Sequence, residues 1–171
     1  MIHISKILGN IHSDSDLYEK YQDMLKKDKV EKIELSRLQA DRTRIRKVSD
    51  KGTDLALTLN PGSHIYDGDV VLLTEERIII AKRGSENVAV VSLNNDISTE
   101  QILETAIKLG HIIGNMHRPI RIVNNKVCFP IQSDSEIELF KKLFYNLRQD
   151  IDIKTENIIF EADSGYDIHG H

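Results

Sequence analysis

One histidine in the second half of the chain stands at a well-defined place in the sequence. In the stretch "GHIIGNMHRPIRI", an apolar run typical of a helix meets Gly114 and Asn115, and His117 follows. Gly and Asn favour the end of a helix and Pro119 cannot continue one, so we expect His117 to be exposed at a helix end. An imidazole in such a place is either incidental or a ligand for a divalent metal ion.

Two further histidines, His169 and His171, flank a glycine in the last residues of the chain. A mobile terminal segment can bring imidazoles to a metal ion held elsewhere, so both are candidate ligands. The alternative is that they are the remnant of a purification tag. His111, which we expect on another face of the helix from His117, and Asn115 are weaker candidates that would support a metal ligand.

The chain is mildly acidic and has a single cysteine. Its formal net charge of −4 argues against a protein that mainly binds nucleic acid, because phosphate binding needs a surplus of Lys and Arg. The lone Cys128 excludes an internal disulfide and a cysteine-rich zinc module, and we expect it to be a small buried strand residue rather than a ligand. Any metal site must therefore rest on nitrogen and oxygen ligands.

No apolar run approaches the roughly 20 residues that a membrane-spanning helix needs. The opening "MIHISKILGN" also lacks the apolar core of a signal peptide. The sequence therefore predicts a cytoplasmic protein without membrane association.

Familiar catalytic patterns are missing from the chain. It has no phosphate-binding glycine loop, no His-Glu-x-x-His helix, no Gly-x-Ser-x-Gly elbow and no convincing pair of carboxylates, so we expect it not to be an enzyme. An RNA-binding module is a weaker alternative, because the predicted central strands offer mainly Ile and Val with one aromatic residue, Phe129, for base stacking.

The elements that position these residues fall into two halves, with the boundary at Gly84. The first, residues 1–84, reads as short strands joined by turns with one short helix, which predicts a small all-β domain. Its strands are predicted in "IHISKIL", "KIELS", "DLALTL", "YDGDVVLL" and "EERIIIAKRG", and its helix in "DSDLYEKYQDMLKK".

In "DRTRIRK" of the first half, Arg42, Arg44 and Arg46 alternate, which would place them on one face of a strand. Such a face is either a solvated surface or a docking surface for an acidic partner.

The second half, residues 85–162, alternates strands with helices. "NVAVVSL" predicts a strand, and the helix after it starts with a capping box of Ser98 and Gln101. Its apolar positions have helical spacing: Ile102, Ala106, Leu109 and Ile113.

A hairpin, a helix and a strand are then predicted. "PIRIV" and "KVCF" flank Asn124-Asn125, a pair that favours a tight turn. Ser133 and Glu136 repeat the capping spacing ahead of Ile137, Phe140, Phe144 and Leu147, and "ENIIFEA" follows as a last strand. The order βαββαβ predicts a ferredoxin-like domain, so the fold class is α+β, and residues 163–171 form a flexible tail that contains histidine.

Together these stretches resemble the urease accessory protein UreE family of nickel metallochaperones, over nearly the whole chain. The most specific stretch is "GNMHRP", which is similar to the family's Gly-Asn-x-His-x-Pro motif. The histidine of that motif binds metal at a dimer interface, so the resemblance implies this role for His117. The supporting stretches are "DRTRIRKVSDKG", "LTLNPGSHIYDGDVVL" and "IIFEADSGYDIHGH".

The resemblance implies a protein that binds Ni2+ and delivers it for assembly of the urease active site. It implies an N-terminal β domain for partner or peptide binding and a ferredoxin-like domain for metal binding and dimerisation. The implied partners are a second copy in a homodimer, the urease GTPase UreG and the urease apoprotein complex. Zn2+ and Cu2+ suit the same imidazole ligands, so general storage or buffering of divalent metals is the competing reading.

Two features depart from the family. Many relatives have Asp-His at the start of the second helix of the metal domain, where this chain has Asp134-Ser135, so an auxiliary ligand is absent at that position. Many relatives also have a long histidine-rich tail, whereas here the tail holds only His169 and His171. This argues against high-capacity nickel storage and leaves delivery intact.

Overall fold

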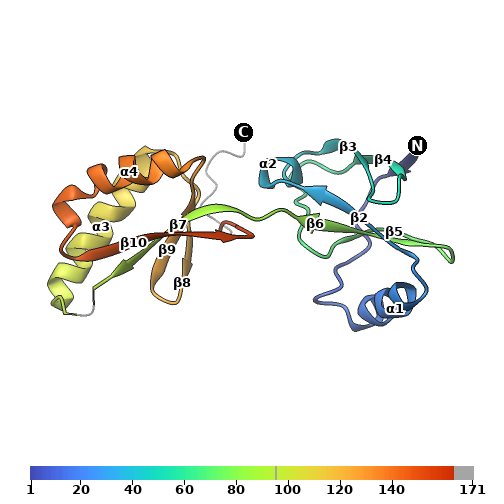
Figure 1. Cartoon of the computed structure of the whole chain (residues 1–171), viewed down its shortest axis with the longest axis horizontal. Helices are drawn as coiled ribbons and strands as arrows, with labels where there is room; N and C mark the ends of the chain where they lie inside the picture. The colour runs from blue at the N-terminus through green and yellow to red at the C-terminus, as the bar shows by residue number, and fades with distance from the viewer. Residues whose placement is uncertain (95, 164–171) are drawn as a thin grey trace. The chain divides into compact units, whose positions relative to one another are not determined.

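The computed structural model describes residues 1–94 and 96–163. These residues combine helices with three β-sheets, so the predicted α+β class is confirmed (Figure 1). The chain divides into two compact units, Met1–Gly84 and Ser85–His171.

The N-terminal unit, described in full, contains two three-stranded sheets. The first has the strand order β1-β4-β3, with β1 parallel and β3 antiparallel to β4. The second has the order β2-β6-β5, with β2 parallel and β5 antiparallel to β6. In chain order the strands are β1 (Ile2–Ile4), β2 (Val30–Leu35), β3 (Arg44–Val48), β4 (Asp54–Thr58), β5 (Val70–Leu73) and β6 (Ile78–Arg83).

The second sheet lies between two hydrophobic cores because successive side chains of a strand point to opposite faces. Ile79 of β6 packs in one core with Leu57 of β4, which belongs to the first sheet. Its neighbour Ile78 packs in the other core with Leu17 of helix α1 (Ser15–Lys26). The purely apolar run of β6 is thus explained by burial on both faces.

Two helices belong to this unit, so the prediction of an all-β domain is wrong in that respect. The predicted helix is present as α1, whose N-cap Asp14 accepts a hydrogen bond from the backbone N–H of Leu17. It covers a sheet face that would otherwise expose the apolar residues Ile78 and Ile80. A short helix α2 (Arg37–Ala40) was not predicted.

The basic stretch before β4 forms strand β3, which begins at Arg44. Arg42 precedes the strand, so the prediction of one shared strand face is confirmed for Arg44 and Arg46 only. Both of those side chains are exposed.

In the C-terminal unit the described elements follow the order β-α-β-β-α-β. The sheet has the order β10-β7-β9-β8, and its three strand pairings are antiparallel. The elements are β7 (Glu86–Leu93), α3 (Thr99–Asn115), β8 (Arg121–Val123), β9 (Lys126–Pro130), α4 (Asp134–Leu143), a 3-10 turn (Tyr145–Leu147) and β10 (Ile151–Ile158).

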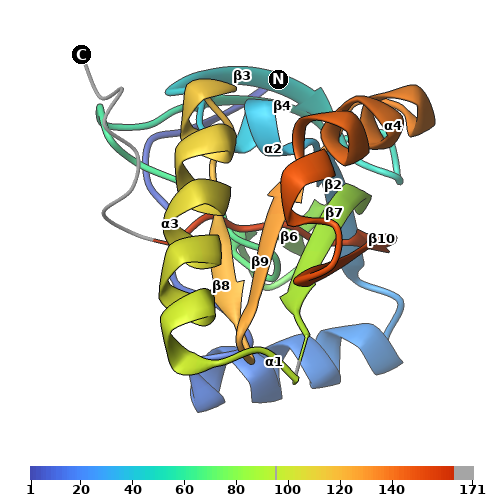
Figure 2. The ribbon, with the colours of Figure 1, turned by 90° about the vertical axis from the view of Figure 1, so that its left-hand side faces the viewer.

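Helices α3 and α4 cover the same face of this sheet (Figure 2). The core between them contains Phe129 of β9, whose ring centroid lies 4.6 Å from that of Phe140 and 6.5 Å from that of Phe144. Leu109 and Ile113 of α3 complete this core. Phe129 therefore points toward the helices and offers no aromatic surface for base stacking.

The predicted hairpin around Asn124-Asn125 is confirmed. Both asparagines have positive φ angles, 48° and 58°, as a two-residue hairpin turn requires. The turn joins β8 to β9, with Val123 opposite Lys126. Asparagine tolerates this conformation, so the turn brings β8 back along the sheet edge beside α3.

Helix α3 begins at the predicted capping box, in which Ser98 and Gln101 each bond the other's backbone N–H. Its predicted apolar stripe is only half buried, because Ile102 and Ala106 are exposed. Their place in the core is taken by Thr105, whose hydroxyl donates to Asp150 at 3.1 Å.

The second predicted capping box is wrong. Ser133 precedes α4 but its side chain makes no capping hydrogen bond, and its hydroxyl instead lies 2.8 Å from that of Ser135. The carboxylate of Glu136 accepts from the backbone N–H of Gln132 and from Arg118.

The last strand starts earlier than predicted. Strand β10 covers Ile151–Ile158 and pairs with the whole of β7, whereas the prediction began at Glu156. The apolar residues after Ile158 do not extend the strand. Phe160 is instead fully buried against Val88 and Cys128 on the sheet face opposite the helices.

Candidate functional site

His117 lies just beyond α3 in the left-handed backbone conformation, with a φ of 51°. Its N–H donates to the carbonyl of Gly114 at 2.9 Å, and the N–H of Arg118 donates to that of Ile113 at 3.4 Å. These two bonds form a Schellman motif, in which the residue in this position is usually glycine. The side chain of His117 is exposed, so a fixed backbone presents the ring at the surface.

Helix α3 ends at Asn115, so the predicted helix end at Gly114-Asn115 is confirmed. The left-handed residue is His117 itself. A residue with a side chain costs about 1 kcal/mol more than glycine in this conformation, although histidine is among the residues enriched there. An imidazole at this helix end therefore costs the fold a small amount of stability relative to glycine.

The residue after His117 is tied to the second helix. The guanidinium of Arg118 forms an ion pair with Glu136 of α4, and the two side chains are only 18% and 13% exposed. Glu136 also accepts from the backbone N–H of Gln132 at 2.6 Å. The segment that carries His117 is thus held against the start of α4, a contact between distant residues that no local sequence pattern indicates.

A second tether joins this region to the start of the predicted tail. The N–H of Asp163 donates to the carbonyl of Ile120 at 3.1 Å, and its carboxylate accepts from the N–H of Ile122 at 2.7 Å. Asp163 was predicted as the first residue of the flexible tail but is bonded to the segment that follows His117. The predicted ligands His169 and His171 lie outside the described residues.

The two weaker candidates contact each other. The side-chain nitrogen of Asn115 lies 3.0 Å from Nε2 of His111, one helical turn earlier. His111 also borders a small cavity with Leu143 and Leu147, so it faces the α4 side of the helix. These contacts join the two side chains to each other and to α4, and they do not indicate a metal ligand.

Across residues 1–94 and 96–163, no three side chains of His, Cys, Asp or Glu gather as a metal site. Cys128 is buried, and burial raises the pKa of its thiol above the usual value, which disfavours the thiolate that a metal would bind. The prediction of Cys128 as a small buried residue is confirmed. His117 therefore contributes a single imidazole to any site built from the described part of one chain.

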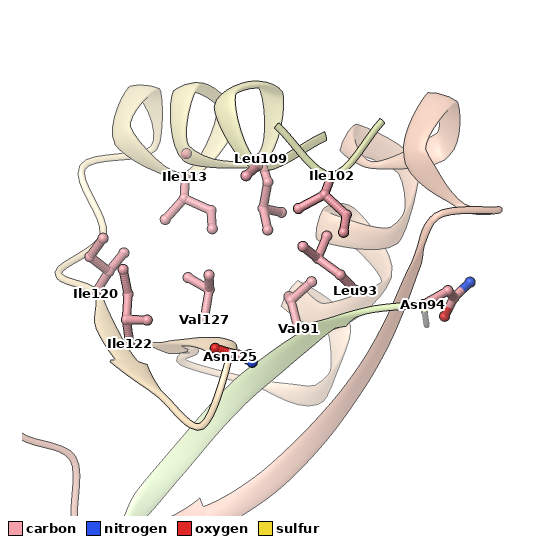
Figure 3. A pocket seen from close by; sticks show the side chains of 12 residues that line it. Val91, Leu93, Asn94, Ile102, Leu109, Ile113, Ile120, Ile122, Asn125 and Val127 are labelled. Atoms are coloured by element: carbon pink, nitrogen blue, oxygen red, sulfur yellow. The ribbon is translucent and has the colours of Figure 1, made fainter. Parts of the chain in front are cut away.

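A broad apolar groove lies beside the segment of His117, between α3 and the edge of the sheet (Figure 3). Its volume is about 570 Å³. Side chains from the helix and from the strands point toward each other across it. The residues that line it include Ile102, Leu109, Ile113, Ile120, Ile122 and Val127.

The groove continues into an exposed apolar surface. Leu103 and Ile107, on the outward side of α3, are 63% and 62% exposed, and Ile122 of the edge strand β8, which also lines the groove, is 53% exposed. Scattered apolar residues are normal on a protein surface, but a contiguous group of them marks an interaction site. We call Leu103, Ile107 and Ile122 the α3–β8 surface.

None of the helices in the described residues is long and apolar enough to cross a membrane.

Comparison with known proteins identifies relatives of this chain. Residues 4–82 match the family model described as UreE urease accessory protein, N-terminal domain. The chain is also similar to proteins named Urease accessory protein UreE. The one from Natronomonas pharaonis is 29% identical over 137 residues, which cover 80% of this chain and 63% of the relative. Those from Yersinia enterocolitica and Yersinia intermedia are 30% and 31% identical over 135 residues, or 77% of this chain and 57% and 58% of the relatives.

The chain thus spans between 57% and 63% of the length of these relatives. Because an alignment of 135 residues is longer than the unit Met1–Gly84, the similarity extends into the C-terminal unit. The family model and the relatives agree, and both confirm the resemblance of the chain to the UreE urease accessory proteins.

Proposed function

We propose that this protein binds Ni2+ as cargo and delivers it for assembly of the urease active site, as a cytoplasmic binding protein rather than an enzyme. Its relatives are named as urease accessory proteins. The observation that carries the proposal is the placement of His117. Its exposed ring is presented by a fixed helix end, and the Arg118–Glu136 ion pair holds the next residue.

One imidazole per chain binds a divalent ion weakly, so the proposal requires a homodimer. In a two-fold dimer with His117 near the axis, the two chains supply two equivalent nitrogen ligands. Helix α3 leads directly to His117, and its outward side carries Leu103 and Ile107 of the α3–β8 surface. We propose that a second copy covers this surface and the adjoining groove.

The contacts of Asp163 support a role for the tail histidines. Asp163 is bonded to Ile120 and Ile122, close in the chain to His117. His169 is the sixth residue after Asp163, and an extended chain of that length reaches about 20 Å. We propose that His169 and His171 add ligands to the metal held by the two His117 rings.

Such a site suits transfer better than storage. Its ligands are exposed and few, so ligands of a recipient can replace them one at a time, whereas a closed structural site retains its ion. We propose UreG and the urease apoprotein complex as recipients. Imidazole also binds Zn2+ and Cu2+, so in the cell the supply of metal and the partners decide which ion is carried.

The first experiment is calorimetric titration of the purified protein with nickel chloride, with molecular mass measured alongside. We expect His117→Ala to weaken nickel binding at least about tenfold and to leave the dimer intact. His3→Ala is the matched control, because it removes an exposed imidazole from the N-terminal unit and should leave the affinity unchanged. Equal affinities of the wild type and His117→Ala would exclude His117 as a ligand.

A second experiment tests the tail and the direction of transfer. Removal of residues 169–171 should lower nickel capacity or affinity without changing the mass of the dimer. Nickel-loaded protein is then mixed with UreG and GTP, and the metal on each protein is measured. Nickel that stays on this protein would favour storage or buffering over delivery.

A further inference from the structure

Strand β3 is the outermost strand of the first sheet, and one of its edges carries peptide groups that β4 does not use. The carbonyl of Thr43 accepts from Leu59, and the N–H of Ser49 donates to Thr53. In an antiparallel ladder the hydrogen-bonded positions alternate, so the odd-numbered residues of β3 bond to β4. The peptide groups of Arg44, Arg46 and Val48 therefore point away from the sheet.

Several other strand edges are covered by the chain itself. Val70 at the outer edge of β5 exchanges hydrogen bonds with Leu8 and Gly9. At β2, Lys32 exchanges them with Asp50. Asp163 covers β8 in the same way, as described above.

The long outer strand β10 of the other sheet carries charges of both signs. Its Lys154 and Glu156 pair with each other at 2.5 Å. Mixed charges of this kind discourage the addition of a foreign strand without favouring one charge pattern.

The edge of β3 differs because its exposed charges are all positive. Arg44 has no ion-pair partner among the residues that the structure describes, and neither has Arg42 just before the strand. Arg46 forms two hydrogen bonds of 3.0 Å with Asp54 of the neighbouring strand, which hold its guanidinium on the same exposed face as Arg44. The edge thus combines backbone groups that β4 does not use with the positive charge of Arg44, beside an Arg46 that is paired with Asp54.

The opposite face of β3 is apolar at its centre. Ile45 is half-buried and lies next to Leu57 of β4, which in turn lies next to Ile4 of β1. A strand added beside β3 would extend this row, because neighbouring residues of paired strands share a face. An apolar side chain opposite Ile45 would gain burial there.

We propose that β3 binds an extended acidic segment of a partner protein, which adds to the sheet as a fourth strand. Alternate residues of the segment are acidic and lie opposite Arg44 and Arg46, while the residue between them is apolar and lies opposite Ile45. The backbone bonds provide affinity and the alternating side chains provide selectivity. This inference concerns the N-terminal unit and does not depend on nickel binding.

A second copy of this chain is a poor occupant of the same edge. Pairing of β3 with β3 would bring arginine side chains of the two chains close together, and like charges in cross-strand pairs are destabilising. Basic residues on an edge strand also discourage self-association in general. The alternative reading of this edge, a solvated surface that only keeps copies apart, predicts no binding of an acidic strand.

The test uses a short fluorescein-labelled peptide of alternating valine and glutamate, with binding to the full chain followed by fluorescence anisotropy. We expect binding that is lost when lysine replaces glutamate in the peptide. Arg44→Glu should weaken binding about tenfold, since it replaces an attractive cross-strand pair by a repulsive one. Lys20→Glu, an exposed charge reversal on α1, is the matched control and should leave binding unchanged.

Two N-methylated versions of the peptide test strand addition itself. Each carries methyl groups on one of the two alternating sets of backbone nitrogens, so only one version loses the donors that face β3. We expect one version to bind at least about tenfold more weakly than the other. Equal binding of the two versions, no binding of the parent peptide, or equal effects of Arg44→Glu and Lys20→Glu would each overturn the proposal.

Discussion

The guanidinium of Arg118 pairs with the carboxylate of Glu136, a residue 18 positions further along the chain. Because both side chains are mostly buried, removal of one partner leaves an uncompensated charge in a poorly solvated place. The pair therefore fixes the segment that follows His117 at the start of α4. A metal ligand gains from such support, since an ordered side chain loses less freedom on binding.

We expect Glu136→Ala to lower the free energy of unfolding by about 2–3 kcal/mol and to weaken nickel binding. Urea unfolding and nickel titration measure the two effects. The control is Glu138→Ala, which removes an exposed carboxylate of the same helix that pairs with Lys141 and should cost less than about 1 kcal/mol. If the two variants lost similar amounts of unfolding free energy, the buried Arg118–Glu136 pair would stabilise the fold no more than an exposed pair does.

The left-handed conformation of His117 predicts that its replacement by glycine stabilises the fold while it removes nickel binding. His117→Gly should raise the free energy of unfolding by about 0.5–1 kcal/mol relative to His117→Ala, because glycine adopts a φ of 51° without steric cost. Both variants should lose the nickel affinity that the imidazole provides. Chemical denaturation of the wild type and the two variants checks the order, and an alanine variant as stable as the glycine variant would contradict the left-handed assignment.

Local patterns predicted local structure well. The capping box at Ser98 and the turn at Asn124-Asn125 each depend on residues within a few positions, and both are present. The same spacing failed at Ser133, because a distant residue, Arg118, and the backbone of Gln132 occupy the carboxylate of Glu136. A capping pattern does not reveal such competition.

Long-range pairing explains the remaining differences. The early part of β10 is rich in polar residues, and its strand conformation comes from the ladder with β7, in which Ile151 lies opposite Leu93. The contacts of Asp163 near His117 likewise depend on how the sheet folds. The sequence indicated His117 as the candidate ligand, but its left-handed conformation became clear only from the bonds around the helix end.

A buried polar network in the N-terminal unit gives a prediction for pH. Glu31, on β2, accepts a hydrogen bond of 2.5 Å from Ser49 and one of 3.1 Å from Arg77, which also bonds Thr53. Burial by itself raises the pKa of the Glu31 carboxyl. Hydrogen bonds from Ser49 and Thr53 and the charge of Arg77 outweigh burial and hold that pKa below its usual 4.5.

Because the folded pKa of Glu31 is depressed, the network contributes stability above pH 4.5, and that stability is lost as the pH falls through the folded pKa. Glu31→Gln should therefore be less stable than the wild type by about 1–3 kcal/mol at neutral pH, with a smaller difference in acid. Urea unfolding at both pH values measures this. Glu34→Gln on the exposed side of the same strand is the control, and a difference that grows in acid would show that the sign is wrong.

The last prediction concerns the α3–β8 surface and the proposed dimer. Ile107 is 62% exposed, so Ile107→Glu should not unfold the chain, but it would place a charge in the dimer interface. We expect the variant to be monomeric by sedimentation, with nickel affinity reduced about as much as in His117→Ala, because a monomer offers one His117 ring. Leu38→Glu is the matched control, since Leu38 is 65% exposed in the N-terminal unit. It should leave both the mass and the affinity unchanged. A monomeric Ile107→Glu variant that still binds nickel with wild-type affinity would show that one chain supplies the whole site, and a dimeric one would place the interface elsewhere.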